Sequence, residues 1–306
     1  MKRIEKNGYP ISEMMLGTVQ LGLSYGINNQ KGMPTYEESA AILQTALDLG
    51  ICAFDTARAY GKSEEVLGRF FSASPAEKTI ITKVIFPNET KDEVASSLFA
   101  QVKDSTKTLG LEKLPFVMLH REDYLVTYGD ALTDALWELK KEGLVGGVGV
   151  SFSDKSRMNA LLDTDLFDCI QIPQNIFDNR ELTDGTLRAL AARDIAVFIR
   201  SVYLQGLFFR DTDTLPPKLA VAKPTLDKLH ALADKNGLSM SQMALAYIRD
   251  GEGISSLVLG CETVEQLCDS AKQFCAPALS PALREELTAL ASEVDPIVTR
   301  PWEWNK

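Results

Sequence analysis

Short apolar segments alternate with amphipathic segments eight times along the chain, and this alternation limits the possible folds more than any other feature. The apolar segments are mostly continuous, as expected for parallel strands buried on both faces. The expected strands cover residues 14–18, 53–55, 79–83, 116–120, 144–151, 168–172, 195–199 and 255–259. The expected helices after them cover residues 36–49, 63–71, 92–109, 130–142, 154–162, 182–193, 225–236 with 241–249, and 263–272.

Eight strand–helix pairs predict an α/β fold, a (β/α)8 TIM barrel. Before the first pair, two short apolar segments flank Asn7-Gly8, a dipeptide favoured in hairpin turns, and we expect an N-terminal β-hairpin on the barrel floor. After the last pair, residues 281–293 predict an extra C-terminal helix. No linker or low-complexity segment divides the chain, so we expect residues 1–306 to form a single domain.

A doubly wound dinucleotide-binding fold is the weaker alternative. That fold needs a G-x-G-x-x-G turn after its first strand. The corresponding turn here reads Gly17-Thr18-Val19-Gln20-Leu21-Gly22 and does not match. Several glycines between residues 143 and 149 lie in an expected strand, where they favour close barrel packing.

Charge and composition exclude several classes of partner. The net charge of −10 argues against nucleic acid or an anionic membrane as a main partner. No apolar run approaches the roughly 18 residues of a membrane span, and no apolar region follows the basic residues 1–6, so we expect a cytoplasmic location. The 5 cysteines lack CxxC spacing and there are only 2 histidines, so no metal site is expected. The oligomeric state stays open, with a monomer as the default.

Four residues with reactive side chains stand at or just after the ends of expected strands. Asp55, Lys83 and His120 close three apolar runs, and Tyr60 lies in the loop after the first. Taken singly, Asp55 can cap a loop, Lys83 can lie on the surface and His120 can be a core histidine. Because the carboxyl ends of barrel strands meet at one face, where active sites lie, we predict that these residues form one site.

The chemistry of the four side chains is coherent. A phenol has a pKa of about 10 and is a poor acid at neutral pH, and an adjacent ammonium is expected to lower that pKa. Asp55 would hold the ammonium of Lys83, and His120 would orient a carbonyl oxygen by hydrogen bonding. Such a site delivers a proton to a carbonyl oxygen. The carbon then needs a hydride, which no side chain supplies and a nicotinamide cofactor does.

The chain resembles the aldo-keto reductases from about Met14 to about Ser270. The most specific segment is Phe54-Asp55-Thr56-Ala57-Arg58-Ala59-Tyr60-Gly61-Lys62-Ser63-Glu64 with Leu67-Gly68. The other matching segments are Leu16-Gly17-Thr18, Ile81-Thr82-Lys83, Leu119-His120-Arg121-Glu122-Asp123, Gly147-Val148-Gly149-Val150-Ser151, Ile170-Gln171-Ile172-Pro173-Gln174-Asn175, Ser201-Val202-Tyr203-Leu204-Gln205-Gly206-Leu207, and Leu259-Gly260-Cys261-Glu262-Thr263-Val264-Glu265-Gln266-Leu267.

The resemblance implies a single (β/α)8 barrel that binds NADP(H) or NAD(H) in extended form across its top. It implies Tyr60 as general acid, assisted by Lys83 and Asp55, with His120 orienting the substrate carbonyl. It further implies a set of cofactor-binding residues. These are Ser151 and Gln171 at the nicotinamide carboxamide, Ser201, Leu204 and Gly206 along the pyrophosphate, Gly260, Glu262, Gln266 and Ser270 at the adenosine end, and also Gly17, Thr18, Asp55 and Val202.

Three positions depart from the family pattern. Phe152 stands where the family usually has Asn, and Arg200 stands where an aromatic residue often stacks on the nicotinamide. Glu262 stands where Arg or Lys often binds the adenosine 2′-phosphate, and a carboxylate there repels phosphate but can accept a bond from a free ribose hydroxyl. The choice between NADP and NAD therefore stays open, and Arg200 is an alternative ligand for the cofactor phosphates.

The sequence places fewer constraints on the substrate pocket. Tyr25, Phe86, Trp302 and Trp304 are candidate walls, and residues 28–34 are a candidate rim. For the two tryptophans, packing on the outside of the barrel is an equal alternative. The substrate and the direction of the reaction stay open.

The resulting hypothesis is a nicotinamide-dependent reductase of an aldehyde, ketone or sugar. Two other functions are compatible with this scaffold. One is a redox-neutral epimerase, dehydratase or lyase that recycles its cofactor, and the other is a regulatory subunit that senses nicotinamide redox state.

Overall fold

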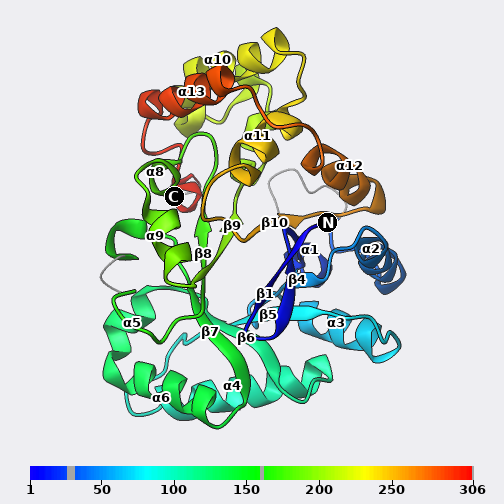
Figure 1. Cartoon of the computed structure of the whole chain (residues 1–306), viewed down its shortest axis with the longest axis vertical. Helices are drawn as coiled ribbons and strands as arrows, with labels where there is room; N and C mark the ends of the chain where they lie inside the picture. Colours follow the sequence, from blue (N-terminus) through cyan, green and yellow to red (C-terminus); the bar gives the residue numbers. More distant parts are fainter. Residues whose placement is uncertain (26–31, 159–161, 305–306) are drawn as a thin grey trace.

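The computed structural model describes residues 1–25, 32–158 and 162–304. Parallel strands close into a central barrel with the helices around it (Figure 1). Each strand pairs with the next, and β10 pairs with β3 to close the ring, so the predicted TIM barrel is confirmed. Its strands are β3 (Met14–Gly17), β4 (Ala53–Asp55), β5 (Thr79–Val84), β6 (Leu114–Leu119), β7 (Val145–Ser151), β8 (Cys169–Pro173), β9 (Ala196–Arg200) and β10 (Ser256–Gly260).

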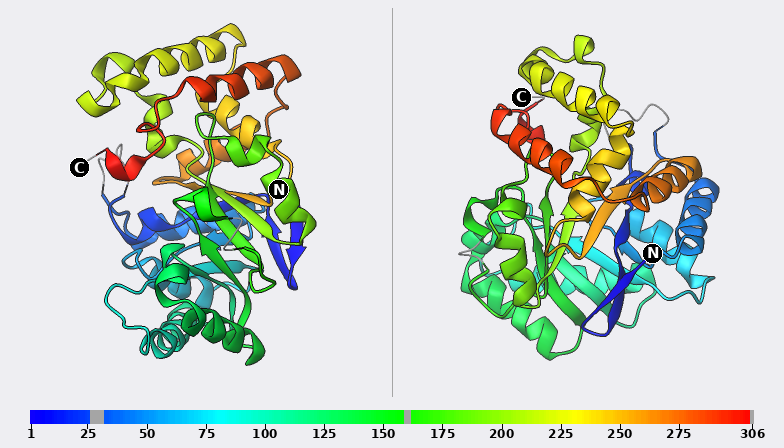
Figure 2. Two further views of the ribbon diagram at one scale, coloured as in Figure 1. Left: turned by 90° about the vertical axis from the view of Figure 1, so that its left-hand side faces the viewer. Right: turned by 45° about the horizontal axis from the view of Figure 1, so that its top comes forward.

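Helices α10, α11 and α13 gather at one end of the molecule, and α4 and α6 lie at the other (Figures 1 and 2). The α-helices are α1 (Val19–Gly22), α2 (Tyr36–Asp48), α3 (Ser63–Ser72), α4 (Val94–Leu109), α5 (Asp123–Tyr128), α6 (Asp130–Lys141), α8 (Arg180–Thr183), α9 (Thr186–Ala192), α10 (Lys223–Lys235), α11 (Met240–Arg249), α12 (Val264–Phe274) and α13 (Pro281–Leu290). Short 3-10 helices are η1 (Lys155–Arg157), η2 (Leu204–Phe209), η3 (Thr212–Thr214), η4 (Pro217–Ala222), η5 (Ala291–Glu293) and η6 (Pro301–Glu303).

Two predicted helices differ from the structure. The helix expected over 182–193 is divided into α8 and α9, because Gly185 adopts a left-handed conformation with φ of 86° between them. The helix expected over 154–162 begins as the 3-10 helix η1, where Asp154 accepts a hydrogen bond from the Ser156 amide, and residues 159–161 lie outside the described part of the chain. The short helices α1 and α5 were not predicted.

The predicted hairpin is present and closes the floor of the barrel. Strands β1 (Arg3–Lys6) and β2 (Tyr9–Ser12) pair antiparallel around Asn7 and Gly8, whose φ angles of 53° and 79° fit the expected turn. The Asn7 side chain donates to the Gly146 carbonyl oxygen at 3.0 Å and to Asp168 Oδ1 at 2.9 Å, near the amino ends of β7 and β8. The hairpin therefore leaves the opposite, carboxyl-terminal face of the barrel for ligands.

Apolar side chains fill the barrel interior above the hairpin. They belong to one buried cluster of Ile11, Met15, Ala53, Ile81, Phe116, Met118, Cys169, Ala196 and Phe198. Close strand packing requires a glycine at Gly149, because a Cβ there would lie 2.5 Å from the Cys169 carbonyl oxygen. The glycines of this strand thus serve packing, as the sequence indicated.

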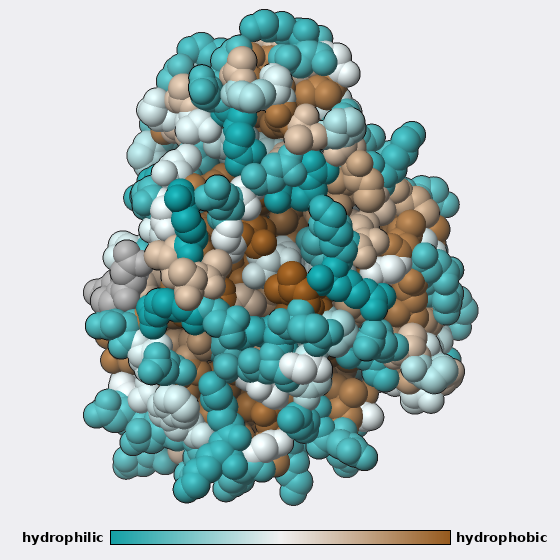
Figure 3. Space-filling model, in the orientation of Figure 1, coloured by the Kyte–Doolittle hydropathy of each residue, from teal (hydrophilic) through white to brown (hydrophobic). Residues whose placement is uncertain are grey.

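Hydrophilic residues cover most of the face shown in Figure 3, with hydrophobic residues in smaller areas between them. Within the described ranges, no helix has both the length and the hydropathy to span a lipid bilayer. Those ranges also contain no group of three or more His, Cys, Asp or Glu side chains arranged to hold a metal ion.

Candidate active site

Three neighbouring strands bring the four predicted catalytic residues together. Asp55 ends β4, Lys83 lies near the end of β5, and His120 directly follows β6. Tyr60 comes from the loop after β4, and its hydroxyl lies 3.5 Å from Lys83 Nζ. The predicted juxtaposition is therefore present, while the catalytic roles stay predictions.

Lys83 is fully buried and forms a tight ion pair. Its Nζ donates to Asp55 Oδ1 at 2.5 Å and to the Thr56 carbonyl oxygen at 3.1 Å. Gln171, from β8, donates through Nε2 to the same Asp55 oxygen at 2.7 Å. Gln171 was predicted to contact the nicotinamide carboxamide, and its bond to Asp55 is a contact that the sequence did not indicate. Asp55 is thus held from two sides of the barrel.

Burial raises the pKa of the Tyr60 phenol above its ordinary value of 10.0, and the opposing charge of Lys83 does not outweigh that effect. Lys83 does lower this pKa, as expected, but the cost of burying a phenolate is larger and sets the net direction. For Lys83, burial lowers the pKa, but Asp55 and Tyr60 raise it to a net value above 10.5. Tyr60 is thus a neutral phenol beside a charged ammonium at neutral pH.

His120 is a neutral imidazole at neutral pH. Burial and the charges of Lys83, Arg200 and Arg121 lower its pKa from 6.5 to about 3. Its ring meets the Tyr60 ring edge to face, with centroids 5.6 Å apart. Its Nδ1 atom is buried and has no hydrogen-bond partner among the described residues. A neutral ring in this position suits hydrogen bonding to an uncharged carbonyl group.

The loop that carries Tyr60 rests directly on helix α1. A Cβ at Gly22 would lie 1.8 Å from the Tyr60 carbonyl oxygen, so only glycine fits there. Beneath the loop, Ser63 Oγ lies 2.6 Å from Thr18 Oγ1 and 2.8 Å from Thr56 Oγ1, all buried. Thr18, predicted to bind cofactor, therefore lies in the network that positions this loop.

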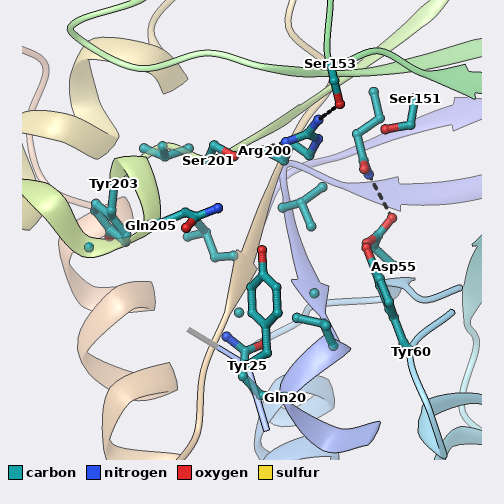
Figure 4. A pocket seen from close by; sticks show the side chains of 18 of the residues that line it. Gln20, Tyr25, Asp55, Tyr60, Ser151, Ser153, Arg200, Ser201, Tyr203 and Gln205 are labelled. Atoms are coloured by element: carbon teal, nitrogen blue, oxygen red, sulfur yellow. Dashed lines mark hydrogen bonds between the residues drawn. The ribbon is translucent and has the colours of Figure 1, made fainter. Parts of the chain in front are cut away.

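A cavity of about 570 Å³ opens over the carboxyl ends of the strands (Figure 4). Most of the predicted site residues line it. These are Gly17, Asp55, Tyr60, His120, Ser151, Gln171, Arg200, Ser201, Val202, Gly206, Gly260 and Glu262.

Five predicted residues do not line the cavity. Lys83 lies behind Asp55, Thr18 lies beneath the Tyr60 loop, and Leu204 is buried. Gln266 accepts a hydrogen bond from the Glu262 amide through Oε1 at 2.7 Å, so it orients the chain at Glu262. Ser270 lies further along α12, partly buried.

Several lining residues were outside the predicted set, and each lies within two positions of a predicted one. Their closeness in sequence to the predicted residues at the strand ends could therefore have identified them. They are Val19, Gln20, Arg121, Ser153, Tyr203, Gln205, Val258 and Leu259. The Gln20 Oε1 atom is buried and lacks a hydrogen-bond partner in the described part of the chain.

Arg200 ends β9 and reaches across to the end of β7. Its Nη2 donates to the Phe152 carbonyl oxygen at 3.0 Å and to Ser153 Oγ at 3.1 Å, and its Nη1 donates to Ser201 Oγ at 3.3 Å. Figure 4 shows the Arg200 side chain directed toward Ser153. The Phe152 side chain, at a position expected to hold Asn, is fully buried.

The chain after Arg200 follows an unusual path. Ser201, Leu204 and Gln205 have φ of 62°, 48° and 54°, a left-handed conformation that costs energy for residues with a side chain. Gly206 continues it with φ of 90°. Strained backbone of this kind is concentrated at ligand-binding sites.

The candidate pocket walls are only partly present. Tyr25 lines the cavity and its ring points into it (Figure 4). Phe86 is buried edge to face against Tyr124 and Tyr128 and does not line the cavity. Trp304 is mostly buried in the hydrophobic core, and its Nε1 donates to the Ile297 carbonyl oxygen, which favours packing outside the pocket.

The other two candidate parts of the pocket are Trp302 and the rim 28–34. Trp302 is 47% exposed and is not among the residues that line the cavity. In the predicted rim 28–34, residues 28–31 lie outside the described part of the chain.

The residues present fit a nicotinamide dinucleotide, which carries an amide, ribose hydroxyls and phosphates. The cavity offers side-chain hydroxyl and amide groups at Ser151, Gln171 and Ser201, and a cation at Arg200. The unpartnered Gln20 Oε1 can accept from a ligand amide or hydroxyl.

The chain is similar to known proteins in sequence and in fold. The sequence model of the Aldo/keto reductase family matches residues 13–291. The chain is 26% identical over 294 residues to L-glyceraldehyde 3-phosphate reductase of Escherichia coli (strain K12), covering 84% of this chain and 83% of that protein. It is 23% identical to L-galactose dehydrogenase of Arabidopsis thaliana, covering 99% and 96%.

Among solved structures, the aldo-keto reductase AKR11C1 from Bacillus halodurans (holo form) superimposes with a TM-score of 0.79 and 20% identity, covering 98% of this chain and 99% of that one. That likeness shows the shared fold. Because the family match spans most of the chain, the chain belongs to the aldo/keto reductase family, whose members are oxidoreductases that use NADP(H) or NAD(H) to reduce carbonyl compounds.

Proposed function

We propose that this chain reduces the carbonyl group of an aldehyde, ketone or sugar to an alcohol, with Tyr60 as the general acid. The observation that carries the proposal is the half-buried Tyr60 hydroxyl 3.5 Å from Lys83 Nζ, with Lys83 itself held by Asp55. A neutral phenol next to a fixed ammonium is suited to donate a proton as negative charge develops on a carbonyl oxygen.

A bound nicotinamide dinucleotide supplies the hydride that the carbonyl carbon receives. Tyr60 donates the phenolic proton to the carbonyl oxygen, so the substrate gains a hydride and a proton. The resulting phenolate lies beside the Lys83 ammonium, which stabilises it by its charge. His120 is neutral and orients the carbonyl by hydrogen bonding.

Other residues of the cavity would hold the cofactor. Ser151 lies next to Gln171 on paired strands, and this pair would bind the carboxamide. The left-handed turn through Gly206 would bind the pyrophosphate, and Glu262 would lie at the adenosine end; both line the cavity. The relatives' names include a phosphorylated aldehyde and a sugar, so aldoses and their phosphates are the first substrates to test.

The proposal is tested with Tyr60→Phe and a matched hydroxyl deletion, Tyr36→Phe, on helix α2. Tyr60→Phe is expected to lose about 10²- to 10⁴-fold in kcat with unchanged cofactor affinity, and Tyr36→Phe to retain activity. Turnover is followed by oxidation of NADPH and NADH. Full activity of Tyr60→Phe would contradict the proposal. Cofactor that copurifies and never turns over with added carbonyls would instead favour a redox-neutral or sensing role.

A further inference from the structure

We propose that the substrate of this site carries an anionic group, a carboxylate or a phosphate, near its carbonyl, and that Arg200 and Ser153 bind that group. This inference rests on the proposed function and names its substrate class. It follows from the partners of Arg200, from its place in the cavity and from the charges around it.

The partners of the Arg200 guanidinium are all uncharged. They are the Phe152 carbonyl oxygen and the hydroxyls of Ser153 and Ser201. In residues 1–25, 32–158 and 162–304, no carboxylate lies within 4.0 Å of its nitrogens. A guanidinium keeps its charge at every physiological pH and has more donors than these contacts use. Arg200 therefore retains donors and a net charge for a ligand.

Arg200 lies at the reacting end of the cavity. It lines the same cavity as Tyr60 and His120, and its positive charge acts on both. In the view of Figure 4, its side chain extends toward Ser153, while Tyr203 and Gln205 lie on the opposite side of the cavity. A group bound at Arg200 is thus near a carbonyl placed at the Tyr60 hydroxyl.

The other charges at this end already have partners. Asp55 is neutralised by Lys83, and Arg121 pairs with Asp123. The Glu122 carboxylate accepts from the backbone amides of Ser153 and Asp154 at 3.1 and 2.8 Å.

Arg200 is therefore the cavity cation at this end that lacks a counter-ion among the described residues, in a chain of net charge −10. A neutral substrate would take this guanidinium out of water without supplying a counter-ion, and that desolvation costs binding free energy. An anionic substrate would pair it by charge-assisted hydrogen bonds. Ser153 Oγ, which the guanidinium fixes in place, adds a neutral hydroxyl that can donate to the same anion.

The experiment compares carbonyl compounds that differ in charge. One pair is glyceraldehyde 3-phosphate against glyceraldehyde, and the other is succinic semialdehyde against butanal. The wild-type protein is expected to have a kcat/KM about 10-fold or more higher for the anionic member of at least one pair. Which pair shows the preference tells a phosphate from a carboxylate.

Arg200→Gln is expected to lower kcat/KM for the preferred anion by about 10- to 100-fold, mainly through KM, and so to lower the ratio of anionic to neutral kcat/KM by about 10-fold or more. Arg200→Lys should restore part of the loss. The matched control is Arg188→Gln, which removes an exposed arginine of the outer helix α9 that pairs with Glu252. It should leave the kcat/KM values for the anionic and the neutral substrate unchanged.

A binding measurement decides the inference without turnover. Glycerol 3-phosphate and succinate are titrated calorimetrically into the wild-type protein with and without NADPH, against glycerol as the neutral control. Saturable binding of either anion that Arg200→Gln abolishes supports the inference, even if no carbonyl is reduced and the proposed function fails.

Two results would overturn the inference while leaving the proposed reductase activity intact. One is equal or better turnover of the neutral member of both pairs, together with no anion binding. The other is an Arg200→Gln variant that loses NADPH affinity but keeps the wild-type ratio between anionic and neutral substrates, which would make Arg200 a ligand of the cofactor phosphates.

Discussion

Replacement of Lys83 by Met separates the electrostatic role of this side chain from its volume. The side chains of Lys83 and Asp55 are only 1% and 4% exposed, and their charged atoms lie 2.5 Å apart. Lys83→Met fills the same space and leaves the Asp55 carboxylate buried without its counter-ion. Asp55 keeps one partner, the Gln171 amide at 2.7 Å.

Breaking a buried ion pair by removing one partner costs about 3–5 kcal/mol. Because the Gln171 amide still stabilises the carboxylate, we expect the lower end, about 3 kcal/mol. For a chain of this size each kcal/mol lowers the melting temperature by about 2 °C, so the expected decrease is about 6 °C. Activity should fall at least about 100-fold, because the Tyr60 phenolate loses its stabilising charge.

The assay is a two-by-two set of wild type, Lys83→Met, Asp55→Asn and the double variant, each measured by thermal unfolding and by steady-state turnover. The double variant has no buried charge, so it should regain at least half of the lost melting temperature while remaining inactive. A melting temperature of Lys83→Met within about 1 °C of wild type would refute the buried-pair argument. So would a double variant that is less stable than Lys83→Met.

The difference in stability between wild type and Lys83→Met should depend on pH in a defined direction. The folded pKa of Lys83 is raised above 10.5, so its contribution to stability is fully present below that pH and is lost as pH rises through the folded pKa. The difference between wild type and Lys83→Met should therefore stay constant from pH 6 to 9 and shrink only in stronger alkali.

Three further predictions concern other residues of the site. The pKa of His120 is about 3 in the folded protein against 6.5 when unfolded, so the stability that this shift contributes should be lost as pH falls from 6.5 toward 3. His120→Gln should therefore lose less stability in acid than the control His230→Gln. NMR of the wild-type protein should show a neutral His120 ring down to about pH 4. Gly22→Ala should displace the Tyr60 loop and lower kcat at least about tenfold with a folded barrel by circular dichroism, and unchanged turnover would contradict this close contact. Glu262→Gln should increase NADPH affinity about 3- to 10-fold relative to NADH in parallel fluorescence titrations, and an unchanged ratio would place Glu262 away from the adenosine phosphate.

Much of the architecture follows from patterns local in sequence. Continuous apolar runs separated by amphipathic segments predict parallel strands with crossover helices, and Asn7-Gly8 predicts the hairpin that closes the floor. Because the carboxyl ends of all strands must meet at one face, the positions of Asp55, Lys83 and His120 along the chain were enough to place them together. The ends of helices were predicted less accurately, as at Gly185, where one residue with positive φ divides a predicted helix into two.

Interactions across the barrel could not be inferred in this way. Asp55 and Gln171 lie 116 positions apart, and nothing near either residue indicates that they share a hydrogen bond. The same holds for Arg200, whose contacts with Phe152 and Ser153 depend on how β7 and β9 are spaced. These contacts decide which groups keep free donors for a ligand.

The sequence by itself determined the barrel, the hairpin and the residue types at the reacting face, because strand and helix periodicity and strand direction are properties of short segments. Only the tertiary structure decided the protonation of Tyr60 and His120 and the lack of a counter-ion at Arg200 among the described residues. The physical reason is that burial and pairing depend on segments far apart in the chain, and the net sign of competing desolvation and Coulomb effects is set only when those segments are brought together.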